Sequence, residues 1–390
     1  MRSSGALRLA VLVTGLTLAP SALGQVSGAS QGFETSIRSS GMGGATTAVS
    51  WGEPGVWGNP AALASTRGIS WLEGNTRLVP ELDGNTRFKS RRFLLGGAGV
   101  GVSLMGAPVE GLGRSRLEFT GSLGTDPFGN PTGSYEAHEQ VDAWGVGISP
   151  LQLVDAVRGL RDPGAKPVSR DFNVSLGYEH KRTEVLLAPG VRAEAANFDW
   201  GVQTRRAVLH GDADGRTPSV DLSAGYAVLN ADQDSRFHFP GSSAPVPSAR
   251  MERMGFAVVA VLPFASGGGP WSWWLGTVPR AVQLGLAYDR EHVTASGSSL
   301  SQDVDHVGLE ASLLEILALR LGYVNDPEGN IDDFSYGVGV HAPIGPWGSV
   351  GYDWASDPVS KDSGLASTKR HGFAAWIHPT ALLESWRGGR

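Results

Sequence analysis

Residues 307–323 read VGLEASLLEILALRLGY, and this stretch decides the fold class. Apolar residues occupy every second position on both sides of a tight turn at Glu315 and Ile316. They are Val307, Leu309, Ala311 and Leu313 before the turn, and Leu317, Leu319, Leu321 and Tyr323 after it. Successive side chains of a strand point to opposite faces. The pattern therefore predicts two antiparallel strands, each with one apolar and one polar face.

The same alternation recurs along most of the chain from about residue 66 onward. Further examples are the segments 172–178, 220–228, 254–264, 282–288 and 334–340. The later connections alternate in length, with a short turn at 342–346 and longer loops at 325–332 and 355–367. Tight turns at one rim and longer loops at the other are typical of a barrel that crosses a membrane.

Chain length sets the expected number of strands. At roughly 22 residues for a strand with its connection, the predicted barrel of residues 65–378 holds about 14 strands, within a range of 12 to 16. Aromatic residues near predicted strand ends could form interfacial girdles: Trp144, Trp200, Tyr288, Tyr323, Trp347, Tyr352, Trp354 and Trp376. A secreted soluble β-sandwich or barrel would also alternate, but these aromatics favour an all-β transmembrane antiparallel barrel.

Composition excludes several other classes of protein. Glycine supplies 55 of the 390 residues, about twice the usual share of ~7%, which suits turns and crowded strands. A net charge of −6 leaves no basic face for nucleic acid. After the N-terminus, no stretch approaches the roughly 20 apolar residues of a membrane-spanning helix. The chain contains no cysteine, so disulfides and thiolate metal sites are absent.

The N-terminus has the features of an export signal. Arg2 and Arg8 precede a short apolar run from Leu9 to Leu18. A small-residue cleavage pattern stands before Gln25. We therefore predict a cleaved signal peptide over residues 1–24. Residues 379–390 are expected to form a tail beyond the last strand.

Two boxes follow the predicted signal peptide. The first is Gly41, Met42, Gly43, Gly44 and Ala45, and the second is Asn59, Pro60 and Ala61, with Leu63 after it. This opening resembles that of the PorV/PorQ-type outer-membrane barrels, which are relatives of the FadL-type long-chain fatty-acid channels. The segments 308–310 and 317–323 resemble the late hairpin of the same family. The chain departs from the family's pattern in two places. Residues 51–53 are Trp, Gly and Glu where the family usually has an acidic pair, and the C-terminus extends beyond the last predicted strand.

The resemblance implies a fold, a location and two alternative functions. Residues 25–64 would form a plug inside the barrel, whereas a periplasmic extension before the first strand is the simpler alternative. The protein would lie in the bacterial outer membrane among membrane lipid, and would bind and pass small hydrophobic molecules as the plug shifts. The alternative is an adaptor or shuttle of a protein secretion system, with secretion proteins as partners.

Motifs for catalysis or for a cofactor are not found in the sequence. The nine histidines are scattered, and no pair has the H-E-x-x-H spacing of a zinc site. The segments 212–215 and 325–333 contain Asp, Asn and Gly that could gather around Ca²⁺, but solvated turns account for them more simply. Residues 151–160 read as a short amphipathic helix at a rim or in the membrane interface. We predict no enzyme, no metal and no cofactor.

Charged residues on the polar parity of the strands are expected to face the lumen. They are Asp171, Glu179, Asp221, Asp289 and Arg320. Such residues could tune passage through the barrel, although holding the wall together is the simpler account.

Overall fold

The computed structural model describes most of the chain after residue 28. The described residues are 29–31, 33–51, 55–78, 86–106, 115–125, 131–162, 164–210, 217–241, 245–262, 282–296, 301–344 and 347–377, with only the backbone for 119–125 and 131–135. The predicted signal peptide and the predicted tail lie outside these residues, as does the candidate Ca²⁺ segment 212–215. Among the described residues, no helix has the length and apolar character needed to cross a membrane.

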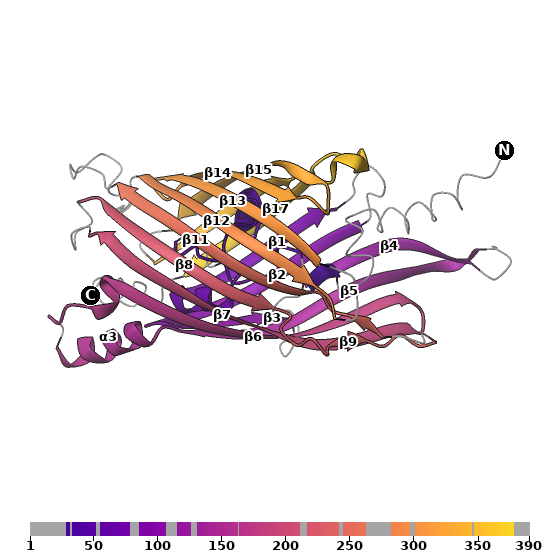
Figure 1. Ribbon diagram of the computed structural model, residues 1–390, viewed down its shortest axis with the longest axis horizontal. Coiled ribbons are helices and arrows are strands. Elements are labelled where there is room, and N and C mark those ends of the chain that lie inside the picture. The colour runs from indigo at the N-terminus through magenta and orange to yellow at the C-terminus, as the bar shows by residue number, and fades with distance from the viewer. Residues whose placement is uncertain are drawn as a thin grey trace.

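The fold is a closed antiparallel β-barrel of 14 wall positions, as the alternation predicted (Figure 1). It closes where β1 pairs with β17, for example Gly74 with Gly372. The wall strands are β1 (Gly68–Arg77), β2 (Thr86–Gly97), β3 (Val100–Met105), β4 (Ser115–Thr125), β5 (Pro131–Ile148), β6 (Phe172–Ala188), β7 (Val191–Leu209), β8 (Ser219–Leu229), β11 (Arg250–Leu262), β12 (Val282–Thr294), β13 (Ser301–Leu313), β14 (Leu317–Asp326), β15 (Ile331–Pro343), β16 (Gly348–Asp357) and β17 (Thr368–Ile377).

The third wall position is interrupted. Both β3 and β4 pair with β2 on one side and with β5 on the other. Met105 at the end of β3 lies opposite Ala143, and Ser115 at the start of β4 lies opposite Val141. β3 therefore ends and β4 begins on either side of a single residue of β5, Asp142.

The two rims differ in their connections. One rim, here called the α3 end, carries the start of β1, the end of β17 and α3 (Pro150–Arg161). The opposite rim, the β9 end, carries the short hairpin of β9 (Arg236–Phe237) and β10 (Val246–Pro247) (Figure 1). The expected rule of short turns at one rim fails, because α3 lies between strands at the tight-turn rim and β6 joins β7 through residues 189 and 190 at the other.

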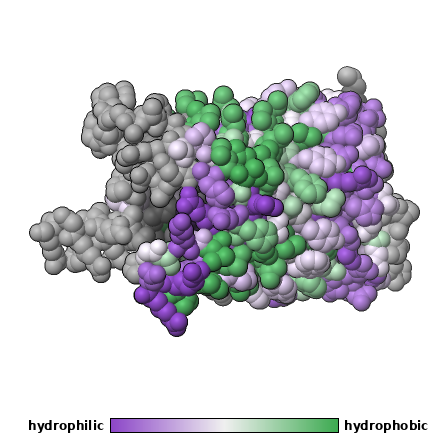
Figure 2. All heavy atoms as spheres, turned by 60° about the vertical axis from the view of Figure 1, so that its left-hand side comes forward, coloured by the Kyte–Doolittle hydropathy of each residue, from purple (hydrophilic) through white to green (hydrophobic). Residues whose placement is uncertain are grey.

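The outer wall is apolar. Outward leucines of β12 and β14 are examples, because Leu284 is 45%, Leu286 49% and Leu319 52% exposed. Leucine is usually buried in a water-soluble protein. Figure 2 shows hydrophobic residues gathered in a band across the wall, with hydrophilic residues beside it. Predicted girdle residues also face outward, including Trp144 at 48% and Trp200 at 40% exposed. A lipid-facing wall explains this exposure, since water would disfavour it.

The segment before β1 folds inside the barrel. It contains η2 (Ala29–Gln31), α2 (Ile37–Gly41) and η3 (Pro60–Ser65), and we call residues 33–67 the plug. Ser36 caps α2 by accepting a hydrogen bond from the amide of Ser39, and Asn59 caps η3 in the same way through Ala61. All described residues of α2 are buried, although α2 is short and partly polar. The surrounding wall therefore stabilises the plug.

Candidate functional site

Wall glycines make room for the plug. Gly101, Gly147, Gly177 and Gly201 lie directly opposite one another on successive strands. A Cβ at Gly177 would lie 2.1 Å from the carbonyl carbon of Pro60, and one at Gly101 would lie 1.8 Å from the carbonyl oxygen of Leu63. These distances are far below van der Waals contact, so only glycine allows the plug backbone to lie against the wall.

The first box lies on the wall strands β13 to β15. Gly43 has a φ of +66° and Gly44 a φ of +85°, conformations that favour glycine. A Cβ at Gly41 would lie 2.9 Å from the Cα of Gly337. Met42 and Ala45 are fully buried in an apolar cluster with residues of β11 and β12. The box therefore turns the plug backbone tightly against the wall.

The second box joins two parts of the plug to the wall. The side-chain amide of Asn59 donates to the carbonyl oxygens of Thr47, at 2.8 Å, and Val202, at 3.1 Å. Its side-chain oxygen accepts from the amide of Ala61 at 3.0 Å. Pro60 occupies the first position of η3, where a missing N–H costs nothing. Buried Asn59 thus satisfies three backbone groups that would otherwise lack partners.

A buried ion network holds α2. Arg38 of α2 donates two hydrogen bonds of 2.8 Å to the carboxylate of Glu310 on β13. Arg320 donates to Glu310 at 2.7 Å and also binds Asp353 on β16. The indole of Trp51 donates to Glu310 at 2.9 Å. Every lone pair direction of this carboxylate is used, which is the condition under which a buried charge is tolerated.

A second buried ion network lies beside the interrupted wall position. Arg92 on β2 binds Glu179 on β6 at 3.1 Å, and Lys181 binds Asp199 at 2.8 Å. The ring of Trp57 in the plug lies 5.3 Å from the Arg92 guanidinium carbon and 5.2 Å from the Lys181 nitrogen. These distances permit cation–π attraction. Trp57 therefore ties the plug to the wall where β3 ends.

The inner wall carries local apolar clusters toward the β9 end. Phe237 of β9 is fully buried against Val185, Ala193 and Ala195 of β6 and β7. A second cluster joins β8, β11 and β12 through Ala227, Leu229, Met251, Val293 and Ala295. A third contains Trp57, Met105, Val141 and Ala143 beside the interruption. The three apolar clusters are separate, and buried polar residues such as Glu139, Lys181 and Thr183 share the inner face with them.

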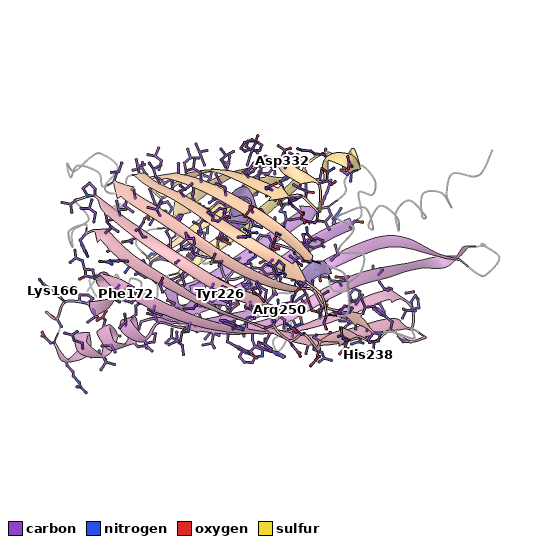
Figure 3. All side chains as sticks on the ribbon, in the orientation of Figure 1. Lys166, Phe172, Tyr226, His238, Arg250 and Asp332 are labelled. Atoms are coloured by element: carbon purple, nitrogen blue, oxygen red, sulfur yellow. The ribbon has the colours of Figure 1, made fainter. Side chains whose placement is uncertain are left out.

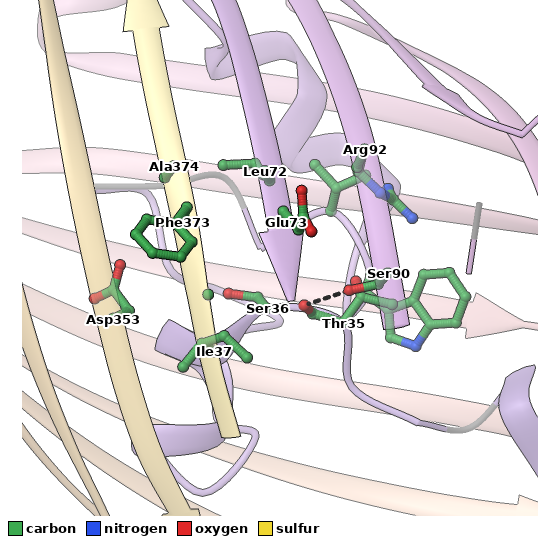
Figure 4. Close-up of a pocket in the computed structure, with 13 residues that line it drawn as sticks. Thr35, Ser36, Ile37, Leu72, Glu73, Ser90, Arg92, Asp353, Phe373 and Ala374 are labelled. Atoms are coloured by element: carbon green, nitrogen blue, oxygen red, sulfur yellow. Dashed lines mark hydrogen bonds between the residues drawn. The ribbon is translucent and has the colours of Figure 1, made fainter. Parts of the chain in front are cut away.

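One small cavity lies between the plug and the wall. This cavity, beside β1, β2 and β17, is lined by Thr35, Ile37 and Trp57 of the plug, and Figure 4 shows Ser90 donating to the carbonyl oxygen of Thr35 there at 3.2 Å. Its volume of about 30 Å³ is enough for a few water molecules at most and leaves no room for an organic ligand.

The predicted lumen-facing charges are mostly where the alternation placed them. Glu179, Asp289 and Arg320 are buried inside the barrel, and Asp289 accepts from the amides of Thr46 and Thr47 at 2.8 Å. Asp221 is half-buried beside Arg205 at 3.0 Å. Asp171 is an exception, because it precedes β6 and lies exposed at the α3 end, where it pairs with His210.

The candidate Ca²⁺ segment 325–333 is a hairpin connection. Asp326 accepts from Gln302 at 2.7 Å and from the amide of Gly329 at 2.8 Å, and Asp332 pairs with Lys361. No group of three or more His, Asp or Glu residues able to hold a metal ion occurs among the described residues.

Sequence reasoning missed how the plug is held. Glu310 lies in the family-like segment 308–310, and nothing in the sequence pairs it with Arg38, 272 positions away. The sequence did hold one sign of this network. Glu310 and Arg320 both lie at the polar alternate positions of a hairpin whose other positions are apolar, so both would face the lumen.

Comparisons with known proteins concern the fold. No protein-family model and no curated protein matches the chain. It is similar to the crystal structure of the Ralstonia pickettii toluene transporter TbuX, with a TM-score of 0.44 and 11% identity over 88% of this chain and 98% of that chain. It is also similar to a Pseudomonas aeruginosa FadL homologue, with a TM-score of 0.39 and 11% identity over 88% and 98%. For the Pseudomonas putida toluene transporter TodX, the TM-score is 0.39 and the identity 10% over 88% and 97%.

Proposed function

We propose that this chain is a bacterial outer-membrane channel that binds and passes small hydrophobic molecules. The observations that support it best are the inward apolar clusters at the β9 end, above a plug held by buried ions. An outer-membrane barrel that only carried water and ions would line its lumen with polar residues. Apolar side chains turned inward instead favour solutes that leave water readily.

The proposed route begins at the β9 hairpin. Phe237 covers Val185, Ala193 and Ala195 there, and displacing it would uncover an apolar surface for a solute. The route continues toward Trp57 and Met105. Below Trp57 the lumen is filled by the plug, so a solute cannot continue along the barrel axis while the plug stays in place.

The interruption of the third wall position provides the exit in this proposal. Met105 and Val141 belong to the apolar cluster of Trp57, and they lie at the end of β3 and opposite the start of β4. A solute at this cluster could leave sideways, where the backbone ladder is broken. In this route a solute would leave without displacing the plug, and the expectation that the plug shifts stays an untested alternative.

The test uses uptake of an apolar fluorescent probe, N-phenylnaphthylamine, in cells and its binding to the purified barrel. Ala143→Trp adds bulk inside the cluster beside the break, and Ala311→Trp adds the same bulk on the lipid-facing side of β13. We expect A143W to lower uptake several-fold and A311W to leave it unchanged. Both variants must migrate as folded barrels before boiling.

Two outcomes would contradict the channel. The purified protein could fail to bind any apolar probe, or A143W could fold and take up the probe as the parent does. The secretion adaptor is the second candidate, and it predicts co-purification with a secretion component after gentle extraction. A barrel recovered alone would count against the adaptor.

A further inference from the structure

The surface of α3 is arranged unlike that of an ordinary surface helix. In an amphipathic helix on a soluble protein, the apolar face is buried and the polar face meets water. In α3 none of the residues is buried. Val154 is 48%, Val157 51% and Leu160 87% exposed.

The polar side of α3 is the side that holds it to the barrel. Residues three, four and seven apart lie on one face of a helix, which places Gln152, Asp155 and Gly159 together. Gln152 packs on the turn between β2 and β3. A Cβ added at Gly99 in this turn would lie 2.5 Å from the Cβ of Gln152. Asp155 accepts hydrogen bonds of 2.7 Å from the amides of Val168 and Ser169 in η4 (Val168–Arg170).

The base of the helix is also fixed. The amide of Ser149 donates to the carbonyl oxygen of Gly99 at 2.6 Å, and its hydroxyl donates to Asn173 of β6 at 2.6 Å. Arg205 of β7 donates to the carbonyl oxygen of Ser169 at 2.7 Å. The helix therefore has a set orientation, with Leu153, Val157 and Leu160 on the face opposite these contacts.

Basic residues border the apolar face. Arg158 and Arg161 lie in the last turn of α3, and Lys166 follows it, all exposed. Figure 3 shows Lys166 and Phe172 at this end of the barrel. Phe172 begins the lipid-facing side of β6 at 47% exposure, and exposed Arg206 lies opposite it in register. The basic and apolar pattern of α3 thus continues that of the wall.

We propose that α3 docks on the phospholipid surface at the α3 end of the barrel. Leu153, Val157 and Leu160 would enter the boundary between headgroups and acyl chains, while Arg161 and Lys166 bind anionic phosphate groups. An apolar face with flanking basic residues is the pattern of a helix that lies in a membrane interface. This docking does not depend on what the barrel passes.

The absence of cysteine from the chain allows a clean test. Leu160→Cys places a bimane label on the proposed lipid face. Gly159→Cys, with nothing within 4 Å of its Cβ, places the same label on the other side as a matched control. The full-length barrel is inserted into vesicles of phosphatidylethanolamine and phosphatidylglycerol that carry a lipid spin-labelled near the headgroup.

We expect the spin-labelled lipid to quench the label at 160 about threefold more than the label at 159. Replacing phosphatidylglycerol with phosphatidylcholine, or introducing R161E with K166E, should reduce the quenching at 160. Equal quenching at both positions, or quenching at 160 only by aqueous iodide, would overturn the proposal. Heat-dependent gel migration confirms that each labelled barrel is folded.

Discussion

Arg38 of the plug and Glu310 of the wall face each other through two parallel N–H···O bonds of 2.8 Å, although 272 positions separate them. Both side chains are 4% exposed. Each charge would be costly to bury alone, and the pair offsets that cost for both residues. This pair makes occupation of the lumen by the plug part of the folding of the barrel itself.

Glu310→Gln should destabilise the barrel strongly. It leaves Arg38 and Arg320 buried with one fewer negative charge, and removal of one partner of a buried pair costs about 3–5 kcal/mol. Asp332→Asn is the matched control, because Asp332 pairs with Lys361 at the rim of the barrel, where a solvent-exposed pair contributes about 1 kcal/mol or less. Denaturant unfolding of refolded protein measures both. Equal losses in the two variants would show that the buried pair carries no special weight.

Gly177→Ala should displace the plug. The added Cβ would lie 2.1 Å from the carbonyl carbon of Pro60, and crowding of this kind costs about 1–3 kcal/mol. A plug moved from the wall leaves a path for water and small ions, so conductance in planar bilayers should rise. Gly97→Ala is the control, since nothing lies within 4 Å of its Cβ. A silent G177A channel of unchanged stability would contradict the role given to the wall glycines.

Asn59→Asp should be more damaging than Asn59→Ala. The aspartate keeps the acceptor for Ala61 but turns a carboxylate toward the carbonyl oxygens of Thr47 and Val202. A buried group without partners costs about 1–3 kcal/mol, and more when charged. Faster protease cleavage of the plug would report the loss. Asn75→Asp, at a half-exposed position of β1, should leave cleavage unchanged, and the reverse order of the two Asn59 variants would refute this account.

The strands could be predicted because each local segment carries its own signal. In Leu317, Leu319 and Leu321, alternation places every second side chain on the lipid face, and no distant residue is needed to decide this. The strand number followed from chain length, although the uninterrupted wall strands range from 10 to 19 residues. The break between Met105 and Ser115 was not predicted, because the paired strands β2 and β5 stay regular on both sides of it.

The plug contacts could be predicted only in part. The glycines of the first box indicated a tight backbone, and Gly43 and Gly44 do have positive φ. What these glycines touch depends on which wall strand lies beside them, and that follows from barrel closure over hundreds of residues. The same holds for Arg38, whose partner cannot be identified until β13 and α2 are brought together.

Asp155 should make the attachment of α3 depend on pH. Burial of its carboxyl raises its pKa, but hydrogen bonds from Ser169 and Val168 outweigh this and hold the pKa below the ordinary value of 3.8. Because the pKa is lowered in the folded protein, the carboxylate stabilises η4 at every pH above the ordinary pKa of an aspartate. This stabilisation is lost as the pH falls through the pKa that Asp155 has in the folded protein. Amide protection at Val168 and Ser169, corrected for intrinsic exchange, should therefore be constant from neutral pH to about 5 and fall below about 4.

Asp155→Asn should show low protection throughout, whereas Asp171→Asn, which pairs elsewhere, should behave like the parent. Protection that stays constant in the parent down to pH 2 would show that this carboxylate does not hold η4.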